Sequence, residues 1–179
     1  PKPIVTIADG ITMGGGIGVA GHATIRIVTE RSKLAMPETR IGFTPDVGGT
    51  RLLAQAPGRL GEYFAMTGRT MTASDALYMG FADYYVPSEN LEALREALAF
   101  RADPAGPAEI VLLFDETPDA SPLAQARAEW IDEAFAAGSP AEIVERLRES
   151  TAEDASAAVD LLGELSPTGV AVTLDAVRE

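Results

Sequence analysis

The feature that most limits the fold of this chain is a glycine cluster between two short β-branched runs. Glycine occupies positions 14, 15, 16, 18 and 21, and no charged residue interrupts residues 14–21. Ile4–Ala8 precedes the cluster and Ile25–Thr29 follows it, and both runs are typical of buried strands. Lys33–Met36 predicts the start of a third strand. Strands that flank a glycine-rich turn of helix predict an α/β layered fold.

Three interpretations of the glycine cluster are open. In the first, Gly16, Gly18 and Gly21 form the G-x-G-x-x-G motif of a dinucleotide-binding fold, with Glu30 on the ribose. The spacing argues against it, because several residues separate Gly16 from the end of the first run at Ala8. The helix would also be shorter than the roughly twelve residues that a crossover between parallel strands needs.

The second interpretation is structural: a helix begins on glycines because another backbone packs close to it. The third is an oxyanion site. A helix N-terminus offers unpaired N–H groups and about half a unit of positive charge, and glycines let a substrate carbonyl approach them. Such a site suits thioester or ester chemistry, in which an enolate or a tetrahedral oxyanion develops.

Two carboxylates lie in apolar, turn-rich surroundings. Glu38 follows Pro37, and Asp46 lies between Pro45 and a glycine pair. Most other acids, Glu62 among them, are interpreted as solvated faces of amphipathic helices. Glu38 and Asp46 could serve as turn and cap residues. Alternatively, two carboxylates near an apolar pocket would have their pKa values pushed apart, as acid–base catalysis requires.

Composition excludes several classes of site. The chain has 14 basic and 27 acidic residues, a net charge of −13, and its basic residues do not cluster, so we expect no nucleic-acid partner. It has no cysteine, which excludes disulfides, thiolate zinc sites and cysteine nucleophiles. The single histidine, His22, excludes a multi-histidine metal site, so no metal is expected. His22 is expected a few residues into the short helix, as a packed or surface residue, with nothing near it that resembles a triad.

We also expect a soluble protein with no membrane partner. No apolar run approaches the roughly 18 residues of a membrane span, and no signal peptide opens the chain. The expected location is the cytoplasm, or the mitochondrion if the source is a eukaryote. Because the chain begins at Pro1 and continues directly into a strand pattern, we expect it to be a segment of a longer protein.

The pattern divides the chain near residue 103. Residues 1–103 are expected to form an α/β segment and residues 104–179 an α-helical region. The prolines between Asp103 and Pro122 predict a hinge or an extended connection rather than a helix. Beyond them, Ser139 and Ser166 each precede a proline, which is typical of the capped start of a helix.

Taken together, five segments resemble the enoyl-CoA hydratase/isomerase (crotonase) superfamily, and within it most of all the 3-hydroxyisobutyryl-CoA hydrolases. These segments are Lys2–Gly16, Ala35–Gly42, Pro45–Gly49, Leu60–Gly68 and Ala73–Gly80. After about residue 100 the resemblance is weaker and rests mainly on Leu165–Thr168. It implies a crotonase-like core, a ββα spiral, followed by an α-helical C-terminal region, with the chain truncated at both ends.

The resemblance implies roles for four residues. The backbone N–H of Gly15 matches half of the oxyanion hole, and Gly14 and Gly15 line the substrate site. Glu38 matches the second catalytic glutamate of the family. Hydratases carry their first catalytic glutamate where this chain has Gly18, which counts against a hydratase. Asp46 matches an acidic position in the substrate site of the hydrolases.

The reaction implied is hydrolysis of an acyl-CoA thioester, 3-hydroxyisobutyryl-CoA in valine breakdown. Glu38 would act as nucleophile or as base for a water, and Asp46 would hold the substrate hydroxyl or position the water. No cofactor is implied, because CoA is part of the substrate. Two alternatives stay open: an enoyl-CoA isomerase or hydratase-like enzyme, and a non-catalytic member that binds acyl-CoA. Because trimers and hexamers are common in the superfamily, a homo-oligomer is also an expectation.

Overall fold

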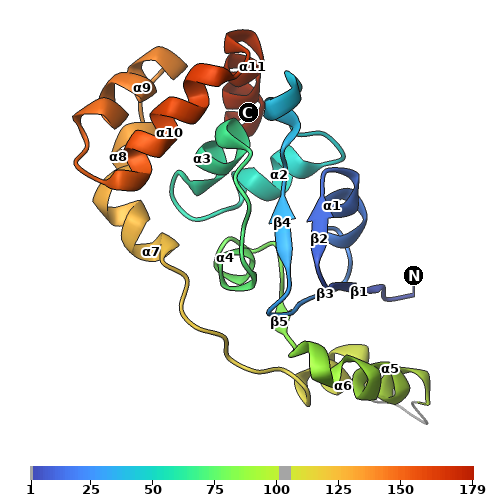
Figure 1. Ribbon diagram of the computed structural model, residues 1–179. Helices are drawn as coiled ribbons and strands as arrows, with labels where there is room; N and C mark the ends of the chain where they lie inside the picture. The colour runs from blue at the N-terminus through green and yellow to red at the C-terminus, as the bar shows by residue number, and fades with distance from the viewer. Residues whose placement is uncertain (1, 101–105) are drawn as a thin grey trace.

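The computed structural model describes residues 2–100 and 106–179 and begins with two turns of a spiral. Each turn contains two short strands followed by helix. The first consists of β1 (Val5–Ala8), β2 (Ile11–Met13) and α1 (Gly15–Ala20); the strands of the second are β3 (Ile25–Val28) and β4 (Lys33–Ala35). β1 pairs in parallel with β3, and β2 pairs in parallel with β4 (Figure 1). The predicted ββα spiral is confirmed.

The sequence did not predict β2. Gly10, at φ 112°, turns the chain directly after β1, and the next three residues pair with β4. Three residues are too few for the alternating pattern that identifies a strand. Because β2 ends at Met13, the glycine cluster does follow a strand closely, contrary to the spacing argument based on Ala8.

A third strand of the first sheet, β5 (Tyr84–Tyr85), pairs with β3. The Arg26 guanidinium and the Asp83 carboxylate form an ion pair of 2.6 Å that ties β3 to the start of β5. Ile25 and Ile27 on β3 belong to one apolar cluster, whereas Val28 belongs to the main core. This division follows the two-residue period of a strand, which sends alternate side chains to opposite faces.

A helix interrupts the segment that the prolines predicted to be non-helical. After η2 (Ser88–Asn90) and α5 (Leu91–Ala99), α6 spans Pro107–Leu112. Proline is tolerated at the first helical position because the N–H it lacks has no intrahelical partner there. Gly106 N donates to Glu109 Oε2 over 3.0 Å, and Ile110 and Val111 are buried in the smaller apolar cluster with α5.

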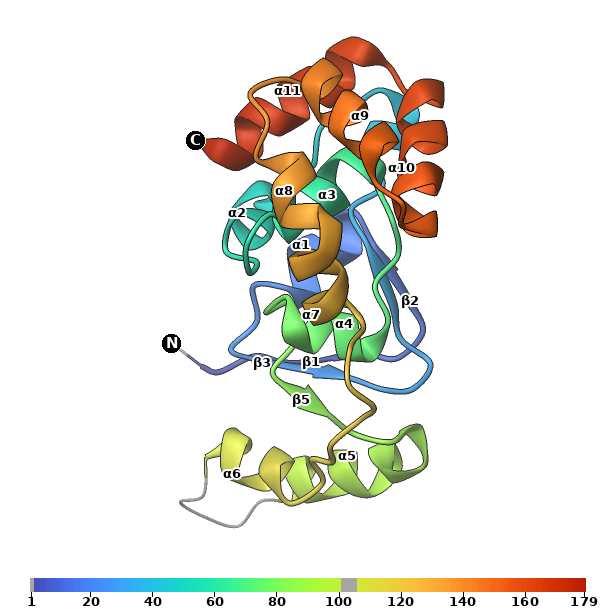
Figure 2. The ribbon, with the colours of Figure 1, turned by 90° about the vertical axis from the view of Figure 1, so that its left-hand side faces the viewer.

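Residues 115–121 contain no helix or strand, as the prolines predict. The boundary near residue 103 falls within residues 101–105, outside the described part of the chain, so the division there stays a prediction. In Figures 1 and 2, α5 and α6 lie at one end of the molecule and the last helices at the other, with this extended segment running between them.

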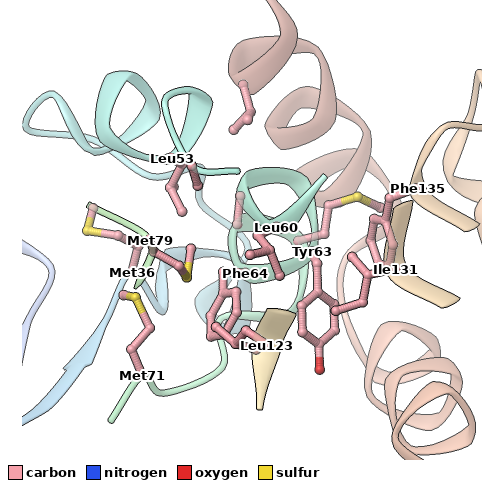
Figure 3. Packing of buried hydrophobic residues seen from close by; sticks show 14 of the residues in the cluster. Met36, Leu53, Leu60, Tyr63, Phe64, Met71, Met79, Leu123, Ile131 and Phe135 are labelled. Carbon is pink, nitrogen blue, oxygen red and sulfur yellow. The ribbon is translucent and has the colours of Figure 1, made fainter. Parts of the chain in front are cut away.

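The main core is built around α3. Four short helical segments follow β4: η1 (Glu38–Ile41), α2 (Gly49–Ala54), α3 (Leu60–Thr67) and α4 (Ala73–Tyr78). Every residue of α3 is buried. Figure 3 shows Leu60, Tyr63 and Phe64 of this helix among methionines and the side chains of neighbouring helices. Apart from Glu62 and Thr67 the residues of α3 are apolar, and a helix with few polar residues around its circumference is expected to be buried.

Glu62 is the exception to the prediction that the helix acids are solvated. Its side chain is only 7% exposed and lies between two guanidinium groups, 2.7 Å from Arg59 and 3.4 Å from Arg178. A buried carboxylate requires such partners, because burial without them costs several kcal/mol. The spacing of acids along the chain could not reveal this, since Arg178 is far away in sequence.

The C-terminal region is helical, as predicted. Its elements are α7 (Leu123–Ala126), the π-helical turn η3 (Arg127–Ile131), α8 (Asp132–Phe135), α9 (Pro140–Glu149), α10 (Glu153–Glu164) and α11 (Pro167–Arg178). The Ser139 hydroxyl accepts from Glu142 N and the Ser166 hydroxyl from Gly169 N, so both predicted caps are confirmed. Trp130 and Phe135 pack edge-on against Tyr63 and close the core over α3.

Among the described helices, none alone has the length and apolar composition of a membrane span. α10 and α11 together reach that length and composition, but the chain bends by 118° between them. Five residues of α11 are buried, and three of these, Val170, Leu174 and Val177, belong to the main apolar core.

Candidate active site

One face of α1 explains part of the glycine cluster. Gly14, Gly18 and Gly21 are spaced four and three residues apart, which places them along one side of the helix. A Cβ atom would lie 3.0 Å from Glu38 Oε1 at Gly14, 2.6 Å from Val47 Cβ at Gly18 and 2.6 Å from Leu52 Cδ1 at Gly21. Side chains of the segment 38–52 therefore pack against this face. The structural interpretation is right that close packing requires these three glycines, but wrong about the neighbour, since the nearest atoms belong to side chains and not to another backbone.

Gly15 has no such neighbour. It is exposed, and a Cβ atom placed on it would meet nothing within 4 Å. As the first residue of α1 its N–H has no acceptor inside the helix. The N–H of the preceding Gly14 is used, because it donates to Ala35 O over 3.1 Å at the end of β4. Packing gives no reason for a glycine at position 15, so its role as an oxyanion donor stays a prediction.

Glu38 is positioned by a short and well-anchored turn. It is the first residue of η1, which ends at Gly42 in the left-handed conformation at φ 78°. The hydroxyl of the next residue, Thr39, donates to Ala65 O on α3 over 3.1 Å. This bond fixes η1 to the buried helix, so the Glu38 carboxyl is held beside Gly14 by the core of the protein.

The Glu38 carboxyl is not fully paired. Its Oε2 atom is buried and has no hydrogen-bond partner among the described residues. Burial raises the pKa of Glu38 above 4.5, the ordinary value of a glutamate, and the negative charge of Asp46 raises it further; a hydrogen bond from its own backbone opposes both. A carboxyl with a raised pKa and a free oxygen is typical of an acid or base in a reaction site.

Asp46 lies on the loop between η1 and α2, and its negative charge is one of the causes that raise the pKa of Glu38. The Asp46 side chain is exposed. The backbone carbonyl oxygen of Asp46 accepts a hydrogen bond from Gly49 N over 2.6 Å, which closes the turn. Gly48 within this turn adopts φ 77°. The structure therefore brings Glu38 against Gly14, and it places Asp46 on the turn whose next residue, Val47, packs against Gly18.

His22 does not join the two acids. α1 ends at Ala20, so His22 lies in the turn beyond the helix rather than within it, and it is exposed. Its Nε2 atom is 3.1 Å from Val47 O. His22 thus supports the loop that carries Asp46. Sequence analysis overlooked Val47, although a β-branched residue within a glycine-containing turn is itself an unusual signal.

The dinucleotide interpretation has no support in this geometry. α1 has only six residues, and the strand that follows it, β3, pairs with β1 rather than with β2. The Glu30 carboxylate accepts from the backbone N and the hydroxyl of Ser88, so it is already engaged. Within residues 2–100 and 106–179, no group of three His, Cys, Asp or Glu side chains is arranged to hold a metal ion.

Comparison with known proteins gives a single family. Residues 1–179 match the family described as enoyl-CoA hydratase/isomerase. A relative from Danio rerio, named 3-hydroxyisobutyryl-CoA hydrolase, mitochondrial, is 37% identical over 185 residues, covering 99% of this chain and 48% of the relative. A relative from Arabidopsis thaliana, named 3-hydroxyisobutyryl-CoA hydrolase 1, is 35% identical, covering 99% of this chain and 49% of the relative. The chain spans about half the length of the curated relatives it matches.

Two solved structures share the fold. A carnitinyl-CoA dehydratase from Mycobacterium thermoresistibile is 46% identical with a TM-score of 0.92, and 99% of this chain covers 51% of that one. An enoyl-CoA hydratase from Rhodobacter sphaeroides is 41% identical with a TM-score of 0.89, and 99% of this chain covers 50% of it. The sequence relatives are thus named as hydrolases, and the structural neighbours as a dehydratase and a hydratase.

Proposed function

Because this chain belongs to the enoyl-CoA hydratase/isomerase family, we propose that its site hydrolyses an acyl-CoA thioester. The observation that carries the proposal is the carboxyl of Glu38, which lies beside Gly14 with one buried oxygen unpaired. α1 itself carries no acidic residue, and position 18 is a glycine. One carboxylate suffices for hydrolysis, whereas adding water across a double bond with two acids requires the second.

In the proposed reaction Glu38 attacks the thioester carbonyl carbon. The carbonyl oxygen takes up the negative charge and accepts a hydrogen bond from Gly15 N–H. The carbon–sulfur bond then breaks, CoA leaves as a thiolate that gains a proton, and an anhydride of Glu38 with the acyl group remains. Water hydrolyses the anhydride and restores the carboxylate. Alternatively, Glu38 removes a proton from a water that attacks the thioester directly.

The proposed substrate is 3-hydroxyisobutyryl-CoA, as in valine breakdown. The names of the relatives support it, and Asp46 offers an exposed carboxylate beside Glu38 that could accept a hydrogen bond from the substrate hydroxyl. CoA enters as part of the substrate, so no separate cofactor is proposed. We propose a mitochondrial location, as in the name of the Danio rerio relative, if the source is a eukaryote, and a cytoplasmic one otherwise.

A hydratase-like reaction is the second candidate. It is favoured by the two solved structures, whose names are those of a dehydratase and a hydratase. Gly18 argues against it, because a hydratase-type acid at that position would overlap Val47. Binding of acyl-CoA without turnover is a third candidate. The experiment below distinguishes it from the other two, because neither CoA release nor hydration would be observed.

The test is to follow CoA release from 3-hydroxyisobutyryl-CoA with a thiol reagent, using the complete reading frame that encodes this chain. Glu38→Gln keeps the shape of the side chain but removes its charge, so we expect it to lower kcat by at least about 100-fold. Hydration of crotonyl-CoA is measured in parallel. Release that is unaffected by Glu38→Gln would contradict the mechanism, and hydration without release would favour the second candidate.

A further inference from the structure

Val47 has an unusual backbone. Its φ is 47°, and among the described residues it is the one non-glycine position with a positive φ. The left-handed region is especially unfavourable for a β-branched side chain, because the Cβ substituents crowd the backbone. Residues held in such conformations concentrate at functional sites, where the surrounding structure maintains them.

His22 and Gly48 hold Val47 in this conformation. His22 Nε2 is 3.1 Å from the Val47 carbonyl oxygen. The imidazole also lies against Gly48, where a Cβ atom would be only 2.6 Å from the same nitrogen. Gly48 itself has φ 77° and therefore adopts the left-handed region without steric cost. The turn is supported from the side of α1.

The Val47 side chain packs against α1, as the Glu38 carboxyl does. It occupies the space above Gly18, with its Cβ 2.6 Å from the position that a Cβ on Gly18 would take. Glu38 lies above Gly14, one helical turn earlier on the same face. The Gly18 N–H donates to the Gly14 carbonyl oxygen over 3.2 Å, so the isopropyl group and the carboxyl both pack against the first turn of α1. Val47 is nevertheless 45% exposed, which leaves one side of it free to contact a ligand.

We propose that Val47 forms a specificity-determining wall of this site. Its side chain leaves no room for an acidic side chain at position 18, and it limits the size of the acyl group that fits beside Glu38. The inference rests on the proposed function for the nature of its substrate. The part of the inference that concerns packing does not rest on the proposed function, since the overlap between Val47 and a side chain at position 18 is independent of any reaction.

The test compares two CoA esters, 3-hydroxyisobutyryl-CoA and the bulkier 3-hydroxyhexanoyl-CoA, in the complete protein. Val47→Gly removes the wall and is compatible with φ 47°, so the variant is expected to fold, which its Tm verifies. We expect it to raise the ratio of kcat/KM for the bulkier ester over the smaller one by about tenfold or more. Val47→Ala should give an intermediate ratio.

Val19→Ala is the matched control. Val19 is an exposed valine on α1, but its side chain projects about 100° around the helix axis from position 18, away from Val47, and it should leave the ratio unchanged. For the packing component, Gly18→Ala should lower Tm by several degrees when position 47 is valine. It should lower Tm much less in the Val47→Gly background, because the overlap is then absent.

An unchanged ratio in Val47→Gly would overturn the inference, even if Gly18→Ala and Val47→Gly prove coupled in stability. If the wild-type protein releases CoA from neither ester, the proposed hydrolysis fails by itself. The ratio is then measured as dissociation constants of the two esters by calorimetry. A ratio shifted toward the bulkier ester in Val47→Gly supports the wall, and an equal ratio in the two proteins overturns it.

Discussion

At the scale of single residues, the site depends on the surroundings of Glu38 more than on its identity. The chain has 27 acidic residues, and Glu38 differs from most of them in being partly buried with an unpaired oxygen beside a second acid. Burial and the charge of Asp46 both disfavour the ionised form, so both raise the pKa of Glu38. As the pH falls, a base with a raised pKa becomes protonated, and therefore inactive, at a higher pH than a solvent-exposed glutamate would.

Asp46→Asn tests this arrangement. Removing the Asp46 charge lowers the pKa of Glu38, so Glu38 stays ionised to a lower pH and the acid limb of the kcat/KM profile should move down in pH. Asp46 is also proposed to contact substrate, so the substitution is expected to lower the rate as well. The pH at which the acid limb lies reports the pKa of Glu38 whatever the rate. Asp160→Asn, at an exposed position on α10, is the control and should leave the limb unmoved. A limb that stays in place or moves up would contradict the coupling.

At the scale of elements, short helices reach their positions through very close backbone contacts. α2 and α3 approach so closely that a Cβ atom on Gly61 would lie 2.0 Å from Leu53 O. A carbonyl oxygen of a helix backbone cannot move aside as a flexible side chain can. Gly61 therefore fixes the distance between α2 and α3, and with it the position of α2, which directly follows the turn that carries Asp46 and Val47.

Gly61→Ala should accordingly destabilise the protein by about 2–3 kcal/mol, in spite of the higher helix propensity of alanine. Gly163→Ala is the matched control, because Gly163 is also a helical glycine but a Cβ atom there meets nothing within 4 Å. We expect this variant to be more stable by up to about 1 kcal/mol. Urea denaturation measures both, and equal effects of the two substitutions would contradict the account.

At the scale of the whole molecule, the last helix is tied to the core by a buried carboxylate. Glu62 on α3 contacts Arg178 near the end of α11, and Arg178 also donates to Ala137 O and Phe135 O. The Glu62 carboxylate pairs with Arg59, just before α3, and with Arg178 of α11. It therefore couples regions that are 116 residues apart. Apolar residues of the C-terminal helices also belong to the same core cluster as those of α3.

Glu62→Ala should destabilise the protein by about 2–3 kcal/mol, less than for a fully buried pair because both arginines are partly exposed. Glu145→Ala, at an exposed position on α9, should change the free energy of unfolding by less than about 0.5 kcal/mol. Chemical denaturation distinguishes them. A Glu62→Ala protein as stable as the wild type would show that the two arginines need no carboxylate at this position.

Local signals in the sequence determined much of the fold. The β-branched runs, the serine–proline helix starts and the glycines act over a few residues, so they predicted β1, β3 and the caps of α9 and α11 without reference to distant parts of the chain. Resemblance to a known family then indicated Gly15, Glu38 and Asp46 as site residues. Local signals failed for β2 and α6, which are short and acquire their stability from partners elsewhere in the chain.

Only the tertiary structure decided how the site is built. Glu38 meets Gly14 and Val47 meets Gly18 because burial of α3 and the pairing of β2 with β4 bring η1 and the 46–49 turn against α1. The burial that raises the pKa of Glu38 and the space above Gly18 that Val47 fills both depend on that meeting. Sequence determines which residues can adopt a conformation, whereas the environment of a carboxyl group depends on which distant segments the core brings beside it.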